Sequence, residues 1–285
     1  MLTTSKTSIL KKHPLISYFL ITFLVTWGIA GLFFLFPDQV VRLTMKEADA
    51  YHPLFRFAVA APTLSAFLVI LVLRGKQGLL SYLARYLDFS ISHRWYALVF
   101  GGIVGFGFLL RFVERSTGVE VPVLPFSWST FILFAGYWLL YDPGPLSEEG
   151  GWRGFALPLL QRRLSPFWSG IILGTVWTLY HLPSFYISTL NQSNFASTFP
   201  LFSISTIALT LFMTYAYNAT RGNLPLMILI HLAYNLTGAL VPMNMQYFAL
   251  FSCLFLVGSL LLSRLRPATP MVEPIPELPK NEHDS

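Results

Sequence analysis

Long apolar runs, separated by short polar segments, dominate this chain of 285 residues. A helix needs about 20 apolar residues to cross the hydrocarbon core of a bilayer. Runs of this kind fall near residues 15–36, 55–73, 95–113, 126–142, 167–187, 200–220, 224–241 and 246–264. The pattern therefore predicts an all-α fold, a polytopic membrane helical bundle of about eight transmembrane helices.

The composition supports this class and excludes others. Hydrophobic residues make up 54% of the chain and charged residues only 11%, whereas soluble domains carry about 25% charge. The net charge of +6 suits basic loops held on the cytoplasmic side of a membrane, so we expect a lipid bilayer as partner and no nucleic acid. The single cysteine, Cys253, allows no internal disulfide and no CxxC metal site.

The loop charges predict the orientation of the bundle. If the chain starts inside, most Lys and Arg lie in cytoplasmic loops. Of the opposite loops, 188–199 and 242–245 contain neither residue, and 37–54 and 114–125 carry mixed charges. We therefore expect both termini in the cytoplasm. Short loops and the lack of a soluble domain favour the cell (inner) membrane of a prokaryote.

The domain organisation that we expect is simple. A cytoplasmic N-terminus, 1–14, precedes one transmembrane helical domain, 15–266, whose polar motifs lie within 147–235. A cytoplasmic tail, 267–285, is rich in Pro and charge and is expected to be disordered. Residues 78–92 are amphipathic and are expected to lie on the cytoplasmic face.

The segment Ser147-Glu-Glu-Gly-Gly-Trp-Arg-Gly154 is the most polar part of the apolar region. It follows Asp142-Pro-Gly-Pro145, which should break a helix, and Ser147 is a plausible N-cap for a new one. Glu149 and Arg153 are four residues apart, so they share a helix face and can pair. Glu148 then lacks that cation, and a lone buried carboxylate has a raised pKa that suits a general base; it could equally be a solvated loop glutamate.

Two further motifs place polar side chains inside predicted spans. His231 and Asn235 share a helix face and could donate hydrogen bonds to an oxyanion, or could simply bond across helices. His181 follows Trp177 by one turn and precedes Pro183, which should kink the helix and open space near the imidazole. A histidine bonded to a neighbouring helix is the alternative.

A metal site is also open on the sequence. Glu148, His181 and His231 could supply two imidazoles and a carboxylate to Zn²⁺. The HExxH signature is absent, and the three residues come from three separate helices. Spacing therefore neither supports nor excludes zinc, and a metal-free site is the preferred interpretation. The remaining acidic residues, Asp88, Glu114, Glu120 and Asp142, are interpreted as loop charges.

Together these motifs resemble a known family. Residues 148–153 resemble the EExxxR motif of the CPBP intramembrane proteases, which are the CAAX-processing and bacteriocin-processing enzymes, also called the abortive-infection family. Residues 177–181 resemble the family's FxxxH motif with Trp177 in place of Phe, a substitution that we expect to be mild. His231-Leu-Ala-Tyr-Asn235 matches its HxxxN motif.

The resemblance implies an intramembrane endopeptidase of a family often labelled metalloprotease, with its site open to the cytoplasm. It implies that Glu148, helped by His181, activates water, that His231 and Asn235 form an oxyanion hole, and that Glu149 and Arg153 hold the local structure. The expected partner is a peptide or protein substrate, with or without a lipid. The alternatives are a non-catalytic membrane scaffold or bacteriocin-immunity protein and, less favoured because the polar residues cluster in one half of the chain, a transporter.

Overall fold

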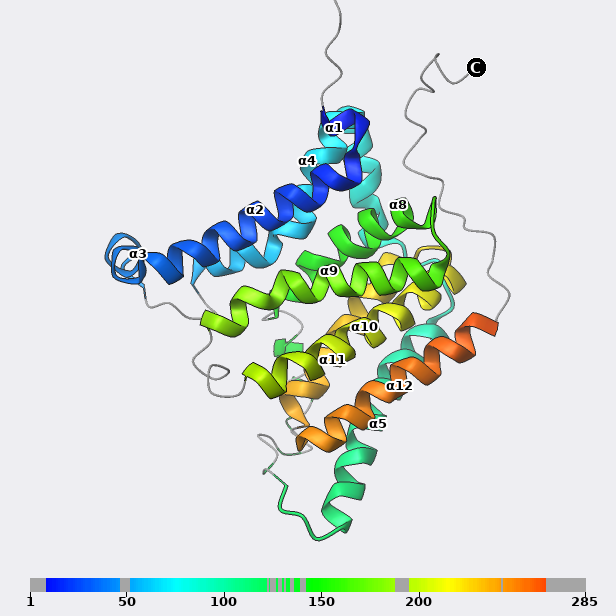
Figure 1. Cartoon of the computed structure of the whole chain (residues 1–285). Coiled ribbons are helices and arrows are strands. Elements are labelled where there is room, and N and C mark those ends of the chain that lie inside the picture. The colour runs from blue at the N-terminus through cyan, green and yellow to red at the C-terminus, as the bar shows by residue number, and fades with distance from the viewer. Residues whose placement is uncertain are drawn as a thin grey trace, which may run out of the picture.

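The computed structural model describes residues 9–46, 52–121, 142–187, 195–241 and 243–264, with isolated positions between 123 and 138. Over these residues the chain is helical and contains no strand (Figure 1). The elements are α1 (Ile9–Lys12), α2 (Pro14–Leu35), α3 (Pro37–Thr44), α4 (Pro53–Ala84), η1 (Arg85–Leu87), α5 (His93–Ser116), α7 (Pro143–Glu149), η2 (Gly150–Ala156), α8 (Leu157–Gln161), α9 (Pro166–Ile187), α10 (Phe195–Ala219), α11 (Leu224–Leu240) and α12 (Met245–Arg264).

The helices follow the apolar runs closely, because each run supplies the length and the composition that a bilayer requires. Five helices are long and apolar enough to cross a membrane, and they lie within α2, α4 with η1, α5, α10 and α12. Helix α11 is apolar but has only 17 residues, and α9 forms where the fifth run predicted a helix. The fourth run, 126–142, lies largely outside the described residues, as does the tail 267–285.

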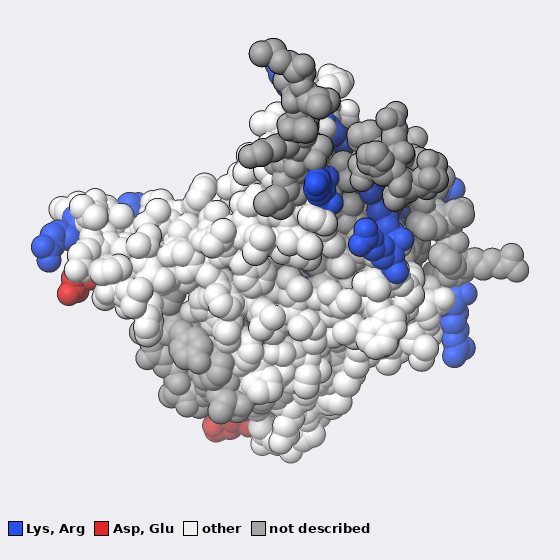
Figure 2. All heavy atoms as spheres, turned by 45° about the horizontal axis from the view of Figure 1, so that its top comes forward, with Lys and Arg blue, Asp and Glu red and all other residues white. Residues whose placement is uncertain are grey.

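The outer surface agrees with an integral membrane protein. Several leucines of the apolar runs point outward, and Leu24 and Leu98 are more than 70% exposed. In Figure 2 most of the visible face carries none of the four charged residue types. Cys253 is exposed on α12, where an apolar surface surrounds it. Hydrocarbon is the solvent that makes such a surface stable.

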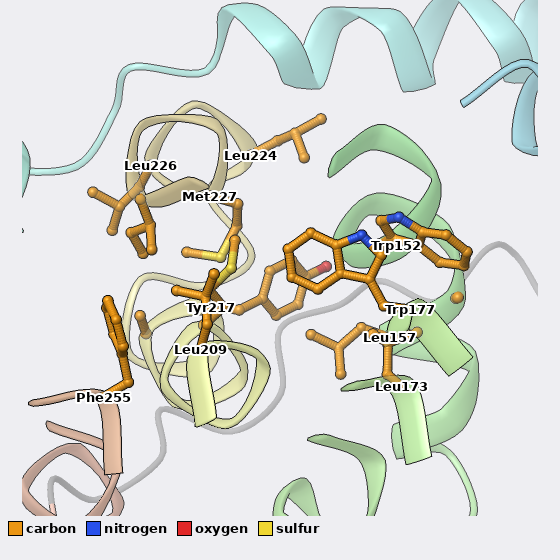
Figure 3. Packing of buried hydrophobic residues seen from close by; sticks show 14 of the residues in the cluster. Trp152, Leu157, Leu173, Trp177, Leu209, Tyr217, Leu224, Leu226, Met227 and Phe255 are labelled. Carbon is orange, nitrogen blue, oxygen red and sulfur yellow. The ribbon is translucent and has the colours of Figure 1, made fainter. Parts of the chain in front are cut away.

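The helices pack into one bundle around a shared aromatic core. Helix α4 packs along α2, α9 lies against both α2 and α10, and α12 packs on α10 and α5 (Figure 1). Tyr18, Trp152, Phe155, Phe251 and Phe255 are fully buried in this core. Figure 3 shows part of it, with Leu209 and Met227 between the aromatic rings.

The segment from 143 to 161 is the element that positions the polar motifs. We expected Asp142-Pro-Gly-Pro145 to break a helix, and Asp142 is indeed non-helical, but the prediction that Ser147 caps the next helix was wrong. Helix α7 begins at Pro143, and the Asp142 carboxylate caps it by accepting the Gly144 N–H at 3.0 Å. Proline suits this first position because it has no N–H to satisfy. The chain then continues through η2, a π-helix, a form that is frequent at functional sites.

Two adjacent glycines let this segment lie directly on α4. A Cβ at Gly151 would meet the backbone and ring of Pro62, and a Cβ at Gly150 would meet Tyr86 and Thr63. The Gly151 N–H donates to the Thr63 hydroxyl at 3.2 Å. The paired glycines therefore set the close approach of η2 to the helix that lies beneath it.

The amphipathic stretch 78–92 is mostly exposed, as its pattern indicated, but two of its side chains reach η2. Its residues 78–87 form the end of α4 and all of η1, after a non-helical kink at Gly75. Tyr82 is buried and its hydroxyl donates to the carbonyl of Gly150. Arg85 donates to the Gly154 carbonyl at 2.8 Å and to the Tyr217 hydroxyl at 3.0 Å. The bonds from Tyr82 and Arg85 therefore hold the backbone carbonyls of η2 in place.

One acidic residue that we interpreted as a loop charge is part of the helical bundle. Glu114 belongs to α5 and is fully buried. Its carboxylate accepts the backbone N–H of Asn244 at 3.1 Å, just before α12 begins. The interpretation failed because it treated the end of an apolar run as exposed, whereas packing against α12 encloses it.

Candidate active site

A cavity of about 420 Å³ brings together polar residues that are far apart in the sequence. It lies between α2, the start of α4, α7, α9, α10 and α11. Four of the six residues singled out from the sequence line it, namely Glu148, His181, His231 and Asn235. The other two, Glu149 and Arg153, are fully buried behind its wall.

Glu148 is held by two indole groups. Its Oε2 accepts hydrogen bonds from Trp152 Nε1 at 3.2 Å and from Trp177 Nε1 at 2.6 Å. Trp152 and Trp177 belong to the wall of the apolar core that Figure 3 shows. The interpretation of Trp177 as a mild replacement for Phe was therefore incomplete, because phenylalanine has no N–H to donate.

The environment of Glu148 suits a group that exchanges protons. Glu148 lies in α7, outside the five candidate membrane helices, and its side chain is almost completely buried. Burial raises the pKa of its carboxyl to about 7, against the lowering effects of His231 and of the two indole donors. A carboxyl group with this pKa exists in both protonation states near neutral pH.

Glu149 joins two positively polarised side chains. Its Oε1 accepts from Arg153 Nη1 at 2.8 Å, the pair that the i, i+4 spacing predicts, and also from His231 Nδ1 at 2.8 Å. Arg153 is held in turn by Thr210 at 3.0 Å and lies over the Trp177 ring at 4.3 Å. Glu149 therefore orients the His231 ring in addition to binding Arg153, a link that spacing could not reveal across 82 residues.

The bonding of His181 fixes the tautomer of its neutral ring. His181 Nδ1 lies 2.9 Å from the backbone carbonyl of Trp177, one turn earlier on α9. A carbonyl oxygen only accepts hydrogen bonds, so Nδ1 carries the proton. In the neutral ring Nε2 is then an acceptor. His181 lines the cavity and can accept a hydrogen bond from a water molecule there.

Asp142 is a residue of the cavity that we interpreted wrongly as a loop charge. Its Oδ2 accepts from Asn235 Nδ2 at 2.8 Å, while Oδ1 caps α7. The capping role had a signal in the sequence, because Asp before Pro is a common start of a helix. The bond to Asn235 had no such signal, since 93 residues separate the two.

Gly144 marks the point at which the polar groups of the cavity converge. A Cβ at this position would lie 3.2 Å from Asp142 Oδ1, 3.3 Å from Glu148 Oε1 and 3.7 Å from His231 Cε1. In the glycine this space is open to the cavity. A water molecule in contact with the Gly144 Cα on this side would be close to Glu148 Oε1, the oxygen that the indoles leave unbonded.

The zinc arrangement considered from the sequence does not form. Among the described residues, no group of three His, Cys, Asp or Glu side chains could hold a metal ion. As they lie in the structure, Glu148, His181 and His231 therefore do not form a three-ligand metal site.

Comparison with known proteins finds similarity over the region that holds these motifs. Residues 127–237 match the family described as type II CAAX prenyl endopeptidase Rce1-like. The chain is also 31% identical over 101 residues to CAAX prenyl protease 2 of Methanococcus maripaludis, a match that covers 34% of this chain and 37% of that protein. The chain thus spans just over a third of the length of this relative. The family match over residues 127–237 holds all six motif residues. Over residues 127–237 the chain is therefore similar to the Rce1-like, CAAX-processing type of protease.

Proposed function

We propose that this protein is an intramembrane endopeptidase that hydrolyses a peptide bond with a water molecule activated by Glu148. The observation that carries the proposal is the convergence of Glu148, His181, His231 and Asn235 on one cavity. Three separate helices supply these residues. Their side chains provide the two classes of group that such hydrolysis requires, acceptors for a water proton and donors for an oxyanion.

In the proposed mechanism, water binds near Gly144 and donates hydrogen bonds to Glu148 Oε1 and His181 Nε2. Glu148 takes a proton as the water oxygen attacks the carbonyl carbon of the substrate. The carbonyl oxygen becomes an oxyanion, and the same proton then passes from Glu148 to the leaving amine. This transfer completes hydrolysis without any net change in the enzyme.

The oxyanion is stabilised by Asn235 and His231. Asn235 Nδ2 carries two hydrogens and uses one of them on Asp142, so the second can reach the oxyanion. His231 uses its Nδ1–H on Glu149, so Nε2 can donate only when the ring carries both protons. A carboxylate bonded to Nδ1 stabilises that imidazolium form, and the bond from Arg153 holds the Glu149 side chain in place.

The finer features predicted from the sequence belong to this proposal. They are about eight spans, both termini in the cytoplasm, a single transmembrane domain and a cavity reached from the cytoplasmic side of a prokaryotic cell membrane. The substrate would be a peptide or protein, and the name of the archaeal relative suggests a prenylated C-a-a-X tail as the first candidate.

The test is cleavage of a reporter peptide, with and without a prenyl group, by the purified protein in proteoliposomes. Glu148→Gln keeps the size and the indole contacts but removes the base, so we expect at least a 10³-fold loss of kcat, on the order of a general-base contribution. The matched control is Glu120→Gln, because Glu120 is exposed and does not line the cavity.

Each outcome has a clear meaning. Cleavage by wild type and by Glu120→Gln but not by Glu148→Gln supports the proposal. Wild-type kcat in Glu148→Gln refutes it. A wild-type protein that binds both peptides and cleaves neither would favour the scaffold alternative, and flux that depends on Glu148 would favour a transporter.

A further inference from the structure

Asp142 contacts two parts of the proposed site at once. Its Oδ1 accepts the Gly144 N–H at 3.0 Å and thereby starts the helix that carries Glu148. Its Oδ2 accepts from Asn235 at 2.8 Å, on a helix far away in the sequence. Asp142 also lines the cavity, so both bonds lie at its wall.

We propose that Asp142 is a positioning residue, which fixes the amide of Asn235 so that one N–H faces the oxyanion. This inference rests on the proposed function. It assigns a role to a residue outside the three sequence motifs, and it makes the cap of α7 and the oxyanion hole parts of one rigid unit.

The chemistry of the two side chains supports this role. An asparagine amide can rotate by half a turn and exchange its oxygen for its nitrogen at nearly the same shape. A carboxylate only accepts hydrogen bonds, so Asp142 permits only the orientation in which Nδ2 faces it. In the opposite orientation the amide oxygen would face the carboxylate, and two acceptors would repel each other. The donor is therefore already oriented before the substrate arrives.

The distance between the carboxylate and the reacting atoms matters as well. Asp142 Oδ1 and Glu148 Oε1 both lie within 3.3 Å of the position that a Cβ of Gly144 would take. A negative charge this close would oppose a developing oxyanion. The two N–H donors on Asp142 screen that charge, and Asn235 lies between it and the oxyanion.

The decisive variant is Asp142→Asn, since it separates the two contacts. Asparagine caps helices as well as aspartate does, so α7 should form and thermal unfolding should stay close to wild type. The amide at position 142 no longer dictates the orientation of Asn235. We expect kcat to fall by about 10²-fold, the cost of misplacing a group at the reaction centre, with KM nearly unchanged. Serine also caps helices, but its side chain is too short to bind Asn235. Asp142→Ser should therefore show the same loss of kcat as Asp142→Asn.

The exchange variant Asp142→Asn with Asn235→Asp distinguishes positioning from simple structural bonding. It re-forms a hydrogen bond in the reverse direction but puts a carboxylate where the oxyanion donor stood. We expect it to fold and to stay inactive. Restored activity in this double variant, or wild-type kcat in Asp142→Asn, would overturn the inference.

Glu148→Gln separates this inference from the function on which it rests. An inactive Glu148→Gln with a fully active Asp142→Asn refutes only the role of Asp142. An active Glu148→Gln refutes the proposed function itself.

Discussion

Substituting Gly144 by alanine tests the geometry of the cavity with a single methyl group. The methyl carbon would lie 3.2 Å from Asp142 Oδ1 and 3.3 Å from Glu148 Oε1, just below the ordinary contact range of 3.4–4 Å. Movements of a few tenths of an ångström would relieve these contacts. The methyl group would still occupy the space in which the attacking water is proposed to bind.

The expected effects on stability and on activity have opposite signs. The backbone of Gly144 is helical, so alanine lowers the entropy of the unfolded chain and stabilises the helix by up to about 1 kcal/mol. The tight contacts offset part of this gain, and thermal unfolding should shift little. Displacing the water or the base by about 1 Å costs about 10²-fold in rate, which corresponds to about 2.7 kcal/mol in the barrier.

The assay compares kcat for the reporter peptide with the thermal unfolding of the same purified preparation. Gly102→Ala on α5 is the matched control, because Gly102 is helical and exposed and a Cβ there meets nothing within 4 Å. We expect Gly144→Ala to be folded and at least about 10²-fold slower, and Gly102→Ala to match wild type. Wild-type kcat in Gly144→Ala would show that water does not bind at this point.

Three further predictions concern the surroundings of the cavity. In wild type, kcat/KM should rise with pH through about 7, because the base acts only when Glu148 is ionised. Trp177→Phe removes a hydrogen-bond donor that stabilises the ionised Glu148 carboxylate, so the rise in kcat/KM should move to higher pH. Gly151→Ala forces a methyl group against Pro62, and we expect a loss of about 1–3 kcal/mol in the free energy of unfolding. Arg153→Met leaves its buried carboxylate partner without the guanidinium, and should cost about 3–5 kcal/mol in thermal or denaturant unfolding.

Each of these predictions has an outcome that would contradict it. If kcat/KM rises at the same pH in Trp177→Phe as in wild type, the hydrogen bond from the Trp177 indole does not influence the titration of Glu148. Wild-type unfolding of Gly151→Ala would mean that η2 can separate from α4 without loss. For Arg153→Met, the control is the double variant that also carries Glu149→Gln. This variant removes the unpaired buried carboxylate and should recover part of the free energy of unfolding; no recovery would contradict the prediction.

The sequence by itself determined the helices and the chemistry of the motifs. Apolar runs of sufficient length must form helices in a bilayer, since every backbone polar group has to be satisfied within its own segment. This local rule explains why α2, α5 and α12 begin and end close to the predicted limits. The pair of Glu149 with Arg153 was equally local, since helix geometry alone joins residues four apart.

Only the tertiary structure decided which distant side chains meet. The bonds of Glu148 to Trp177, of Glu149 to His231 and of Asp142 to Asn235 connect α9 and α11 to the segment around α7. No periodicity encodes them, because they depend on how the helices pack and rotate against one another. Asp142 shows the limit most clearly: before packing it is an acidic residue in front of a proline, and after packing it lies in the wall of the cavity.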